Sequence, residues 1–167
     1  RCVRRVKEGT SCSLVQSGAS EKWWRRAVKC YCFLRNVYDK VTGNKTPWQK
    51  RFGEDFDGPI IPFGAEVEYK PEEDQEWRCH KFGKKRCPAF FGYVQESGCQ
   101  FQGDLYVLDW EDMEKYDHVS KAPVRRYKHQ EVTVVMPGED LIFPLAEGAL
   151  KQPEPPRQLR HRTQKED

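Results

Sequence analysis

The chain has 167 residues, a net charge of +3 at pH 7 and a mean hydropathy of −0.90. This length fits one domain or two small ones, and no stretch approaches the roughly 20 apolar residues of a membrane-spanning helix, so we expect no membrane span. The N-terminus has no apolar signal-peptide core and opens without methionine on RCVRRVKEG, from which we expect a piece of a longer protein.

The first predicted element is a helix over residues 1–16. One side of it carries the residues that recur at helical spacing, Val3, Val6, Thr10 and Leu14. Ser17-Gly18 is expected to end this helix, because glycine suits the left-handed residue after a helix C-terminus. The short polar turn that follows predicts a helical hairpin with the next element.

The second predicted helix covers residues 20–36, and we expect the rest of the chain to be organised around it. It is the longest apolar-periodic segment, with a predicted buried stripe of Trp24, Ala27, Val28, Tyr31, Leu34 and Tyr38, widened by Trp23, Cys30 and Phe33. The opposite side carries Lys22, Arg25, Arg26 and Lys29. Ser20 is the expected N-cap, and Asp39 follows the expected end.

Residues 39–64 are predicted to be mostly loop, with one short helix in the segment TPWQKRFG. Thr46 is the expected cap of this helix, Pro47 its first residue and Gly53 its end. Trp48 and Phe52 lie four residues apart, so both rings are expected to pin the short helix to the body of the protein.

From Ala65 onward the apolar period changes to two, which predicts strands. The predicted strands are AEVEY, CPAFFGYVQ, DLYVLD, VRRYKHQEVTVV and EDLIFPLA. Short strands with glycine-containing turns favour a small SH3-like β barrel or a curled antiparallel sheet. The predicted fold is therefore α+β, with a helical end and connector at 1–58, a small β domain at 59–150 and a disordered Pro-rich charged tail at 151–167.

The cysteines and acidic residues give little support for catalysis or metal binding. Cys79, His80 and Cys87 lack a fourth zinc ligand, so we favour reduced, small buried side chains. The chain has no Gly-rich phosphate loop, no GxSxG and no HExxH. Carboxylates cluster on predicted loops, where solvation is the simpler interpretation, at Glu72, Glu73, Asp74, Glu76, Asp109, Glu111, Asp112 and Glu114.

Several short motifs follow one another in a specific order. They are Trp24, Ala27, Tyr31, Arg35-Asn36, Lys45-Thr46-Pro47, Phe52-Gly53, Phe63-Gly64, Tyr69, Lys81-Phe82-Gly83-Lys84-Lys85, Phe91-Gly92-Tyr93 and Leu105–Asp109. Over about residues 20–135, this order resembles the C-terminal part of the integrase in copia-type LTR retrotransposon polyproteins. Each motif is weak alone, and their order and spacing carry the resemblance.

The resemblance implies that residues 1–58 end an RNase H-like integrase core, which cuts and joins DNA with three acidic residues and a divalent metal such as Mg²⁺. The last of those acids would precede Arg1, and neither Glu8 nor Glu21 occupies its position. No catalytic residue and no cofactor is therefore expected in this segment, although the parent is expected to be an enzyme. The implied role is to bind and position DNA together with the rest of the polyprotein, in a parent that acts in the nucleus and can form homo-oligomers.

Charge clusters indicate where DNA phosphates would bind. Residues 1–36 hold nine Lys or Arg against two acids, and residues 78–98 hold five against one, although a solvated surface is the plain alternative. The first candidates for phosphate contacts are Lys81, Lys84, Lys85 and Arg86, and the second are Arg125, Arg126 and Lys128. The acidic segments PEEDQE and 109–117 weigh against one continuous DNA-binding face.

The aromatic residues are assigned mainly to packing. The expected structural core comprises Trp24, Ala27, Tyr31, Trp48, Phe91 and Tyr93, and Phe90, Phe91 and Tyr93 are interpreted as barrel core and rim rather than base-stacking platforms.

Two other functions stay open. One is a domesticated, non-catalytic protein-interaction module whose Pro-rich tail recruits partners. The other is a metal-dependent hydrolase that uses the acidic clusters.

Overall fold

A computed structural model describes residues 1–69, 88–109, 112, 115–116, 118–136 and 138–147 of the chain. Several predictions lie outside these residues: the disordered tail at 151–167, the acidic segment 72–76, the basic residues Lys81 to Arg86, and the cysteines and histidine at 79, 80 and 87. No helix in the described part is both long enough and apolar enough to cross a bilayer.

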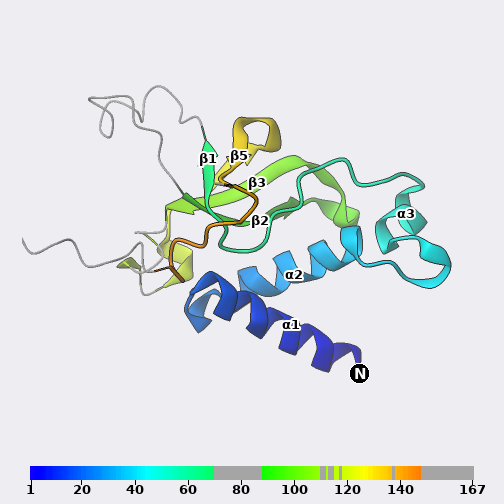
Figure 1. The fold of residues 1–167 in the computed structure, drawn as a ribbon, viewed down its shortest axis with the longest axis horizontal. Helices are drawn as coiled ribbons and strands as arrows, with labels where there is room; N and C mark the ends of the chain where they lie inside the picture. Colours follow the sequence, from blue (N-terminus) through cyan, green and yellow to red (C-terminus); the bar gives the residue numbers. More distant parts are fainter. Residues whose placement is uncertain (70–87, 110–111, 113–114, 117, 137, 148–167) are drawn as a thin grey trace, which may run out of the picture.

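The fold is α+β, as predicted, with N-terminal helices followed by small antiparallel sheets (Figure 1). The helices are α1 (Cys2–Ser17), α2 (Trp24–Tyr38) and α3 (Pro47–Phe52), and the strands are β1 (Val67–Tyr69), β2 (Pro88–Gln95), β3 (Phe101–Asp109), β4 (Arg125–Lys128) and β5 (Val132–Val134). Single 3-10 turns occur at η1 (Glu21–Trp23), η2 (Thr42–Asn44), η3 (Ser97–Cys99), η4 (Val119–Lys121) and η5 (His129–Glu131).

The helices end where the local sequence predicts. Gly18 follows α1 in the left-handed conformation, with φ 69°, and Asp39 follows α2. In α3, the Thr46 hydroxyl accepts a hydrogen bond from the Gln49 N–H at 3.1 Å, and the Gln49 side chain accepts one from the Thr46 N–H at 2.7 Å. These reciprocal bonds satisfy two N–H groups that the helix itself leaves unpaired.

The buried face of α2 differs from the predicted stripe. Its core-facing residues, together with η1, are Trp23, Ala27, Cys30, Phe33 and Val37, whereas Tyr38 is 68% exposed. The predicted stripe, with its widening residues, included Trp23, Ala27, Cys30 and Phe33, but its centre was misplaced, because Trp24 and Val28 are only half-buried. Apolar residues are adjacent in the sequence at several positions of this helix, so periodicity alone does not locate the centre of the buried face. The covered face is the one that meets β2, where an added Cβ on Gly92 would lie 3.9 Å from the Cβ of Cys30, an ordinary packing distance.

β2, β3 and β4 form one antiparallel sheet in that order, and β1 pairs with β5 in a second. The predicted strand VRRYKHQEVTVV is divided, because the turn η5 separates β4 from β5. The predicted last strand, EDLIFPLA, is wrong: residues 140–143 have no regular secondary structure and residues 144–146 form a turn. The Ile142 carbonyl nevertheless accepts a hydrogen bond from the Glu66 N–H at 2.8 Å. The strands of the described part do not close into a barrel.

One buried core connects the helices to the sheets. α2 lies between α1 and the sheet (Figure 1), and the Trp23 ring meets the Phe91 ring edge-on at 4.5 Å. Farther along α2, Phe33 stacks on Tyr93 at 4.1 Å. The core therefore includes residues on both sides of the predicted boundary at residue 58.

Candidate nucleic-acid interface

Alternate residues of β4 point to opposite sides of the sheet. Arg125 points inward, where its guanidinium donates a hydrogen bond to the Tyr69 hydroxyl at 2.6 Å beside the ring of Tyr127. Burial raises the pKa of Tyr127 to about 12, Tyr69 adds to this shift, and Arg125 partly opposes it. Arg125 is thus bound to the protein itself, and the outward face of β4 carries Arg126 and Lys128.

Arg126 and Lys128 are exposed, and each pairs with one carboxylate. Arg126 lies 3.2 Å from Glu96, and Lys128 lies 2.6 Å from Asp104. Exposed ion pairs of this kind contribute about 0–1 kcal/mol, so a phosphate can replace either carboxylate at little cost.

Tyr106 of β3 pairs with Gly92 of β2 across the sheet, and its side chain lies on the side that faces α2. The guanidinium of Arg26 lies 4.4 Å from the centre of the Tyr106 ring, and that of Arg126 lies 5.8 Å from it. A ring attracts a cation over its face, so Tyr106 holds two arginines from different elements close together.

The exposed flank of α2 extends this positive region. Arg25 and Lys29 are exposed one turn apart, and Arg26 lies between them and the sheet. Within the described part of the chain, neither Arg25 nor Lys29 pairs with an acid. We call Arg25, Arg26, Lys29, Arg126 and Lys128, with Tyr106 among them, the basic surface.

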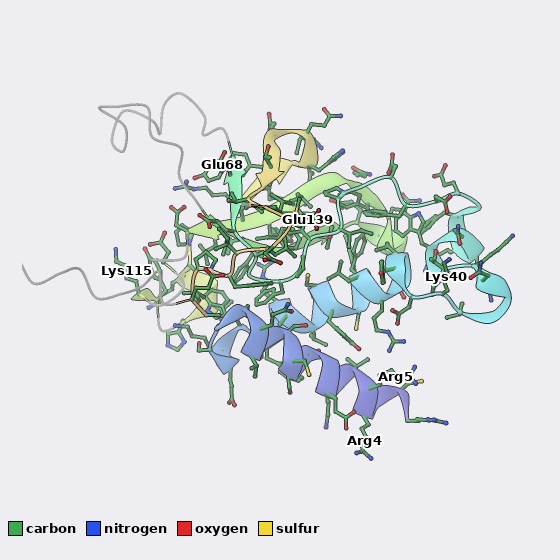
Figure 2. All side chains as sticks on the ribbon, in the orientation of Figure 1. Arg4, Arg5, Lys40, Glu68, Lys115 and Glu139 are labelled. Carbon is green, nitrogen blue, oxygen red and sulfur yellow. The ribbon has the colours of Figure 1, made fainter. Side chains whose placement is uncertain are left out.

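The remaining basic residues of the helices lie elsewhere. Arg4 projects from α1 on the side away from the sheet (Figure 2) and pairs with Glu8 at 2.7 Å. Lys22 donates to the Tyr116 carbonyl at 2.9 Å. The positive charge of residues 1–36 is therefore divided, and the flank of α2 holds the part that borders the open face of β3 and β4.

The aromatic residues of β2 are core residues. Phe90 and Phe91 are fully buried, and Tyr93 is 5% exposed. The Tyr93 hydroxyl donates to the Pro59 carbonyl at 2.8 Å and accepts from the Ile61 N–H at 2.8 Å, and burial raises its pKa. These rings are not available for stacking on bases.

The other expected core residues occupy varied places. Ala27 is buried, and Trp24 and Trp48 are half-buried against the core. Tyr31 is half-buried between the helices, where its ring occupies the space next to Gly9 of α1.

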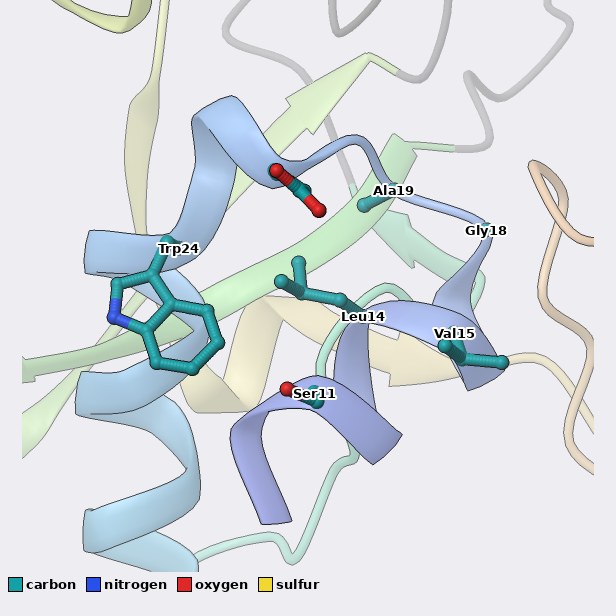
Figure 3. A pocket seen from close by; sticks show the side chains of 7 residues that line it. Ser11, Leu14, Val15, Gly18, Ala19 and Trp24 are labelled. Atoms are coloured by element: carbon teal, nitrogen blue, oxygen red, sulfur yellow. The ribbon is translucent and has the colours of Figure 1, made fainter. Parts of the chain in front are cut away.

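Two hollows lie beside α2. A groove of about 560 Å³ separates the end of α1 from the start of α2 (Figure 3), with Leu14, Val15, Ala19 and Trp24 as its apolar lining and Glu21 on its rim. A smaller cavity of about 140 Å³ lies between the end of α2, α3 and the β2–β3 turn.

The described residues contain no cluster of three His, Cys, Asp or Glu side chains placed to hold a metal ion. Asp109 and Asp112 are described, whereas Glu111 and Glu114 are not, so the hydrolase hypothesis stays untested.

The α2 flank and Tyr106 were missed as candidate binding residues in the sequence. The helical spacing of Arg25, Arg26 and Lys29 was visible, but their closeness to Arg126 depends on which face of α2 meets the sheet.

Comparisons with protein-family models, curated proteins and solved structures found no match to this chain.

Proposed function

We propose that this chain binds and positions DNA as the C-terminal part of a copia-type retrotransposon integrase, without performing strand transfer by itself. The observation that carries the proposal is the basic surface, where Arg26 of α2 and Arg126 of β4 meet over the Tyr106 ring and the same two elements expose Arg25, Lys29 and Lys128. The order of motifs along the sequence supports the choice of family.

The basic surface suits a phosphate backbone rather than a particular base sequence. Arg25 and Lys29 are free of acidic partners within the described part, and Arg126 and Lys128 can exchange their carboxylates for phosphates. Two guanidinium groups held against one ring lose little freedom on binding, so they act as preorganised phosphate ligands. Any divalent metal for catalysis would belong to the preceding core of the parent enzyme.

The proposal includes an SH3-like arrangement of the β region. The bridge between Glu66 and Ala89 connects β1 to β2, which gives the strand order β5-β1-β2-β3-β4 across both sheets. The 3-10 turn η5 between β4 and β5 fits such a small curled barrel.

Duplex DNA binding at two salt concentrations tests the proposed function. Wild-type protein should bind more weakly at the higher salt concentration, because each phosphate contact releases counterions. The variant Arg25→Gln/Lys29→Gln should bind less tightly than Lys40→Gln/Lys121→Gln, which removes the same charge from exposed positions elsewhere. Equal affinity of the two variants, or binding that salt does not affect, would rule out phosphate binding at the basic surface.

A second candidate function is a domesticated protein-interaction module. The apolar groove beside Leu14 and Trp24 favours it, together with Val15, which is 80% exposed at the groove's edge. A partner captured by wild-type protein but not by Val15→Ser, with no DNA affinity in either protein, would favour this function over DNA binding.

A further inference from the structure

The small cavity at the end of α2 has an aromatic wall and a polar rim. Its volume is about 140 Å³, and its lining includes Phe33, Trp48 and Phe52 together with Asn36, Arg51 and Gln95. These residues come from α2, α3 and β2, which meet at the β2–β3 turn.

The aromatic wall is held in place by its neighbours. The Trp48 ring lies 4.3 Å from Phe52, 5.2 Å from Phe56 and 5.9 Å from Phe33, measured between ring centres. The reciprocal hydrogen bonds between Thr46 and Gln49 fix the start of α3 one residue before Trp48. The wall is therefore formed before any ligand arrives, which lowers the entropy lost on binding.

The rim offers unused hydrogen-bonding groups. The side chains of Asn36 and Gln95 are exposed, and neither makes a hydrogen bond within the described part of the chain. Each amide carries both donors and an acceptor, which is the combination that the edge of a nucleobase requires. Proteins that bind single-stranded nucleic acid combine such groups with aromatic or guanidinium planes on which a base stacks.

The volume limits the ligand to one flat ring system. Sites for whole drug-sized ligands measure roughly 300–1,000 Å³, so the cavity is too small for a complete nucleotide. A sugar and its phosphate would have to stay outside, next to the rim.

Positive groups lie where that phosphate would be. The Arg51 guanidinium, 5.5 Å from the Phe52 ring, lines the cavity and pairs with no acid within the described part. Asn36 follows Lys29 by seven residues, which places the cavity about 10 Å along α2 from the basic surface. A strand whose phosphates follow the exposed flank of α2 would thus bring a base to the cavity.

We propose that this cavity receives one unpaired nucleobase, stacked against the Trp48–Phe52 wall and hydrogen-bonded by Asn36 and Gln95, while Arg51 meets its phosphate. The base comes either from a single-stranded nucleic acid or from a free nucleotide. The inference rests on the proposed nucleic-acid binding, which it extends from duplex phosphates to an unpaired base.

The test compares the variant Asn36→Ala/Gln95→Ala with the matched control Gln16→Ala/Gln130→Ala, which removes two exposed amides elsewhere. The probes are a thymine oligonucleotide with one 2-aminopurine, the same oligonucleotide in a duplex, and 2-aminopurine deoxyriboside monophosphate. Affinity is measured by anisotropy for the oligonucleotides and by quenching for the nucleotide, because stacking quenches 2-aminopurine emission.

We expect the cavity variant to bind the single strand about tenfold more weakly than the control, because two hydrogen bonds to the base are lost, with less quenching and an unchanged affinity for the duplex. Similar loss with the free nucleotide would identify the nucleotide as a source of the base. Equal binding by the cavity variant and the control in both the single-strand and the nucleotide measurements would overturn the inference. If wild-type protein shows no salt-dependent duplex binding, that result counts against the proposed function. The comparison of nucleotide affinity between the cavity variant and the control would still show whether the cavity binds a base.

Discussion

Two adjacent tryptophans at the start of α2 have different environments. Trp23 is 1% exposed and packs edge-on against Phe91, whereas Trp24 is half-buried and lines the groove next to α1. The sequence predicted a tryptophan-bearing buried face but assigned the wrong tryptophan to its centre. Periodicity identifies that a helix is amphipathic, and the identity of its partner surface then decides which flank is covered.

Replacing Trp23 by Ala should reduce the free energy of unfolding by about 3–5 kcal/mol, because a large buried side chain leaves a cavity. Trp24→Ala should cost less than half of this, since Trp24 keeps part of its surface in water. Urea unfolding of both variants measures the difference. A larger loss for Trp24→Ala would contradict the orientation of α2.

Because of Cys30, the stability of the folded protein decreases as the pH becomes alkaline. An unfolded thiol ionises near pH about 8.5, whereas burial against the sheet raises the pKa of Cys30 in the folded protein. Below pH about 8.5 both states keep the proton, and above it only the unfolded state loses the proton. The contribution of Cys30 to stability is therefore complete at neutral pH and is lost as the pH rises.

Urea unfolding between pH 7 and 10 should show a smaller decline of stability for Cys30→Ala than for wild type. The difference in slope should approach about 1.4 kcal/mol per pH unit, which corresponds to one proton. Cys12→Ala, at an exposed thiol, serves as the control and should keep the wild-type slope. Parallel curves for Cys30→Ala and wild type would show that Cys30 is accessible to water.

The elements divide into those that the local sequence determines and those that it does not. α1 and α3 are delimited by residues whose effect is local: Gly18 follows α1, the Thr46 cap begins α3 and Gly53 follows it. The break between β4 and β5 was not predicted, because residues 125–134 have strand-like composition throughout and only the sheets show that the chain changes partner at η5. The candidate site was likewise predicted for β4 and missed for α2.

The loop before β1 holds α1 against the sheet through Gly64. Its φ is +80°, and an added Cβ would lie 2.3 Å from the Cβ of Ser17, the last residue of α1. Gly64→Ala should therefore destabilise the protein by more than Gly43→Ala. Gly43 has a similar φ of +78° with nothing near the added Cβ, so its substitution should cost only about 1–2 kcal/mol of backbone strain. Thermal unfolding of the two variants compares them, and equal losses would show that the loop does not approach α1 closely.

At the scale of the whole molecule, helices and sheets share one core. Leu14 of α1, Phe33 of α2 and Leu105 of β3 belong to the same buried cluster. The predicted boundary at residue 58 separated the helical end and its connector from the strands that follow Ala65, but a change of period marks a change of element and not necessarily a separate core.

One core predicts one unfolding transition. Far-ultraviolet circular dichroism and tryptophan fluorescence should give the same urea midpoint, because α2 cannot leave the sheet without exposing Trp23 and Phe91. Two separate midpoints would indicate that the helical end and the β region unfold independently.

The central claim is that the flank of α2 and the outer face of β4 together bind nucleic-acid phosphates. The most direct test is the slope of the logarithm of duplex affinity against the logarithm of salt concentration, for wild type and for Arg25→Gln/Lys29→Gln. Since each lost phosphate contact lowers the steepness of this slope by about 0.9, the account predicts a variant slope shallower by roughly two. An unchanged slope would contradict it, because the two side chains would then make no contact with the backbone of the nucleic acid.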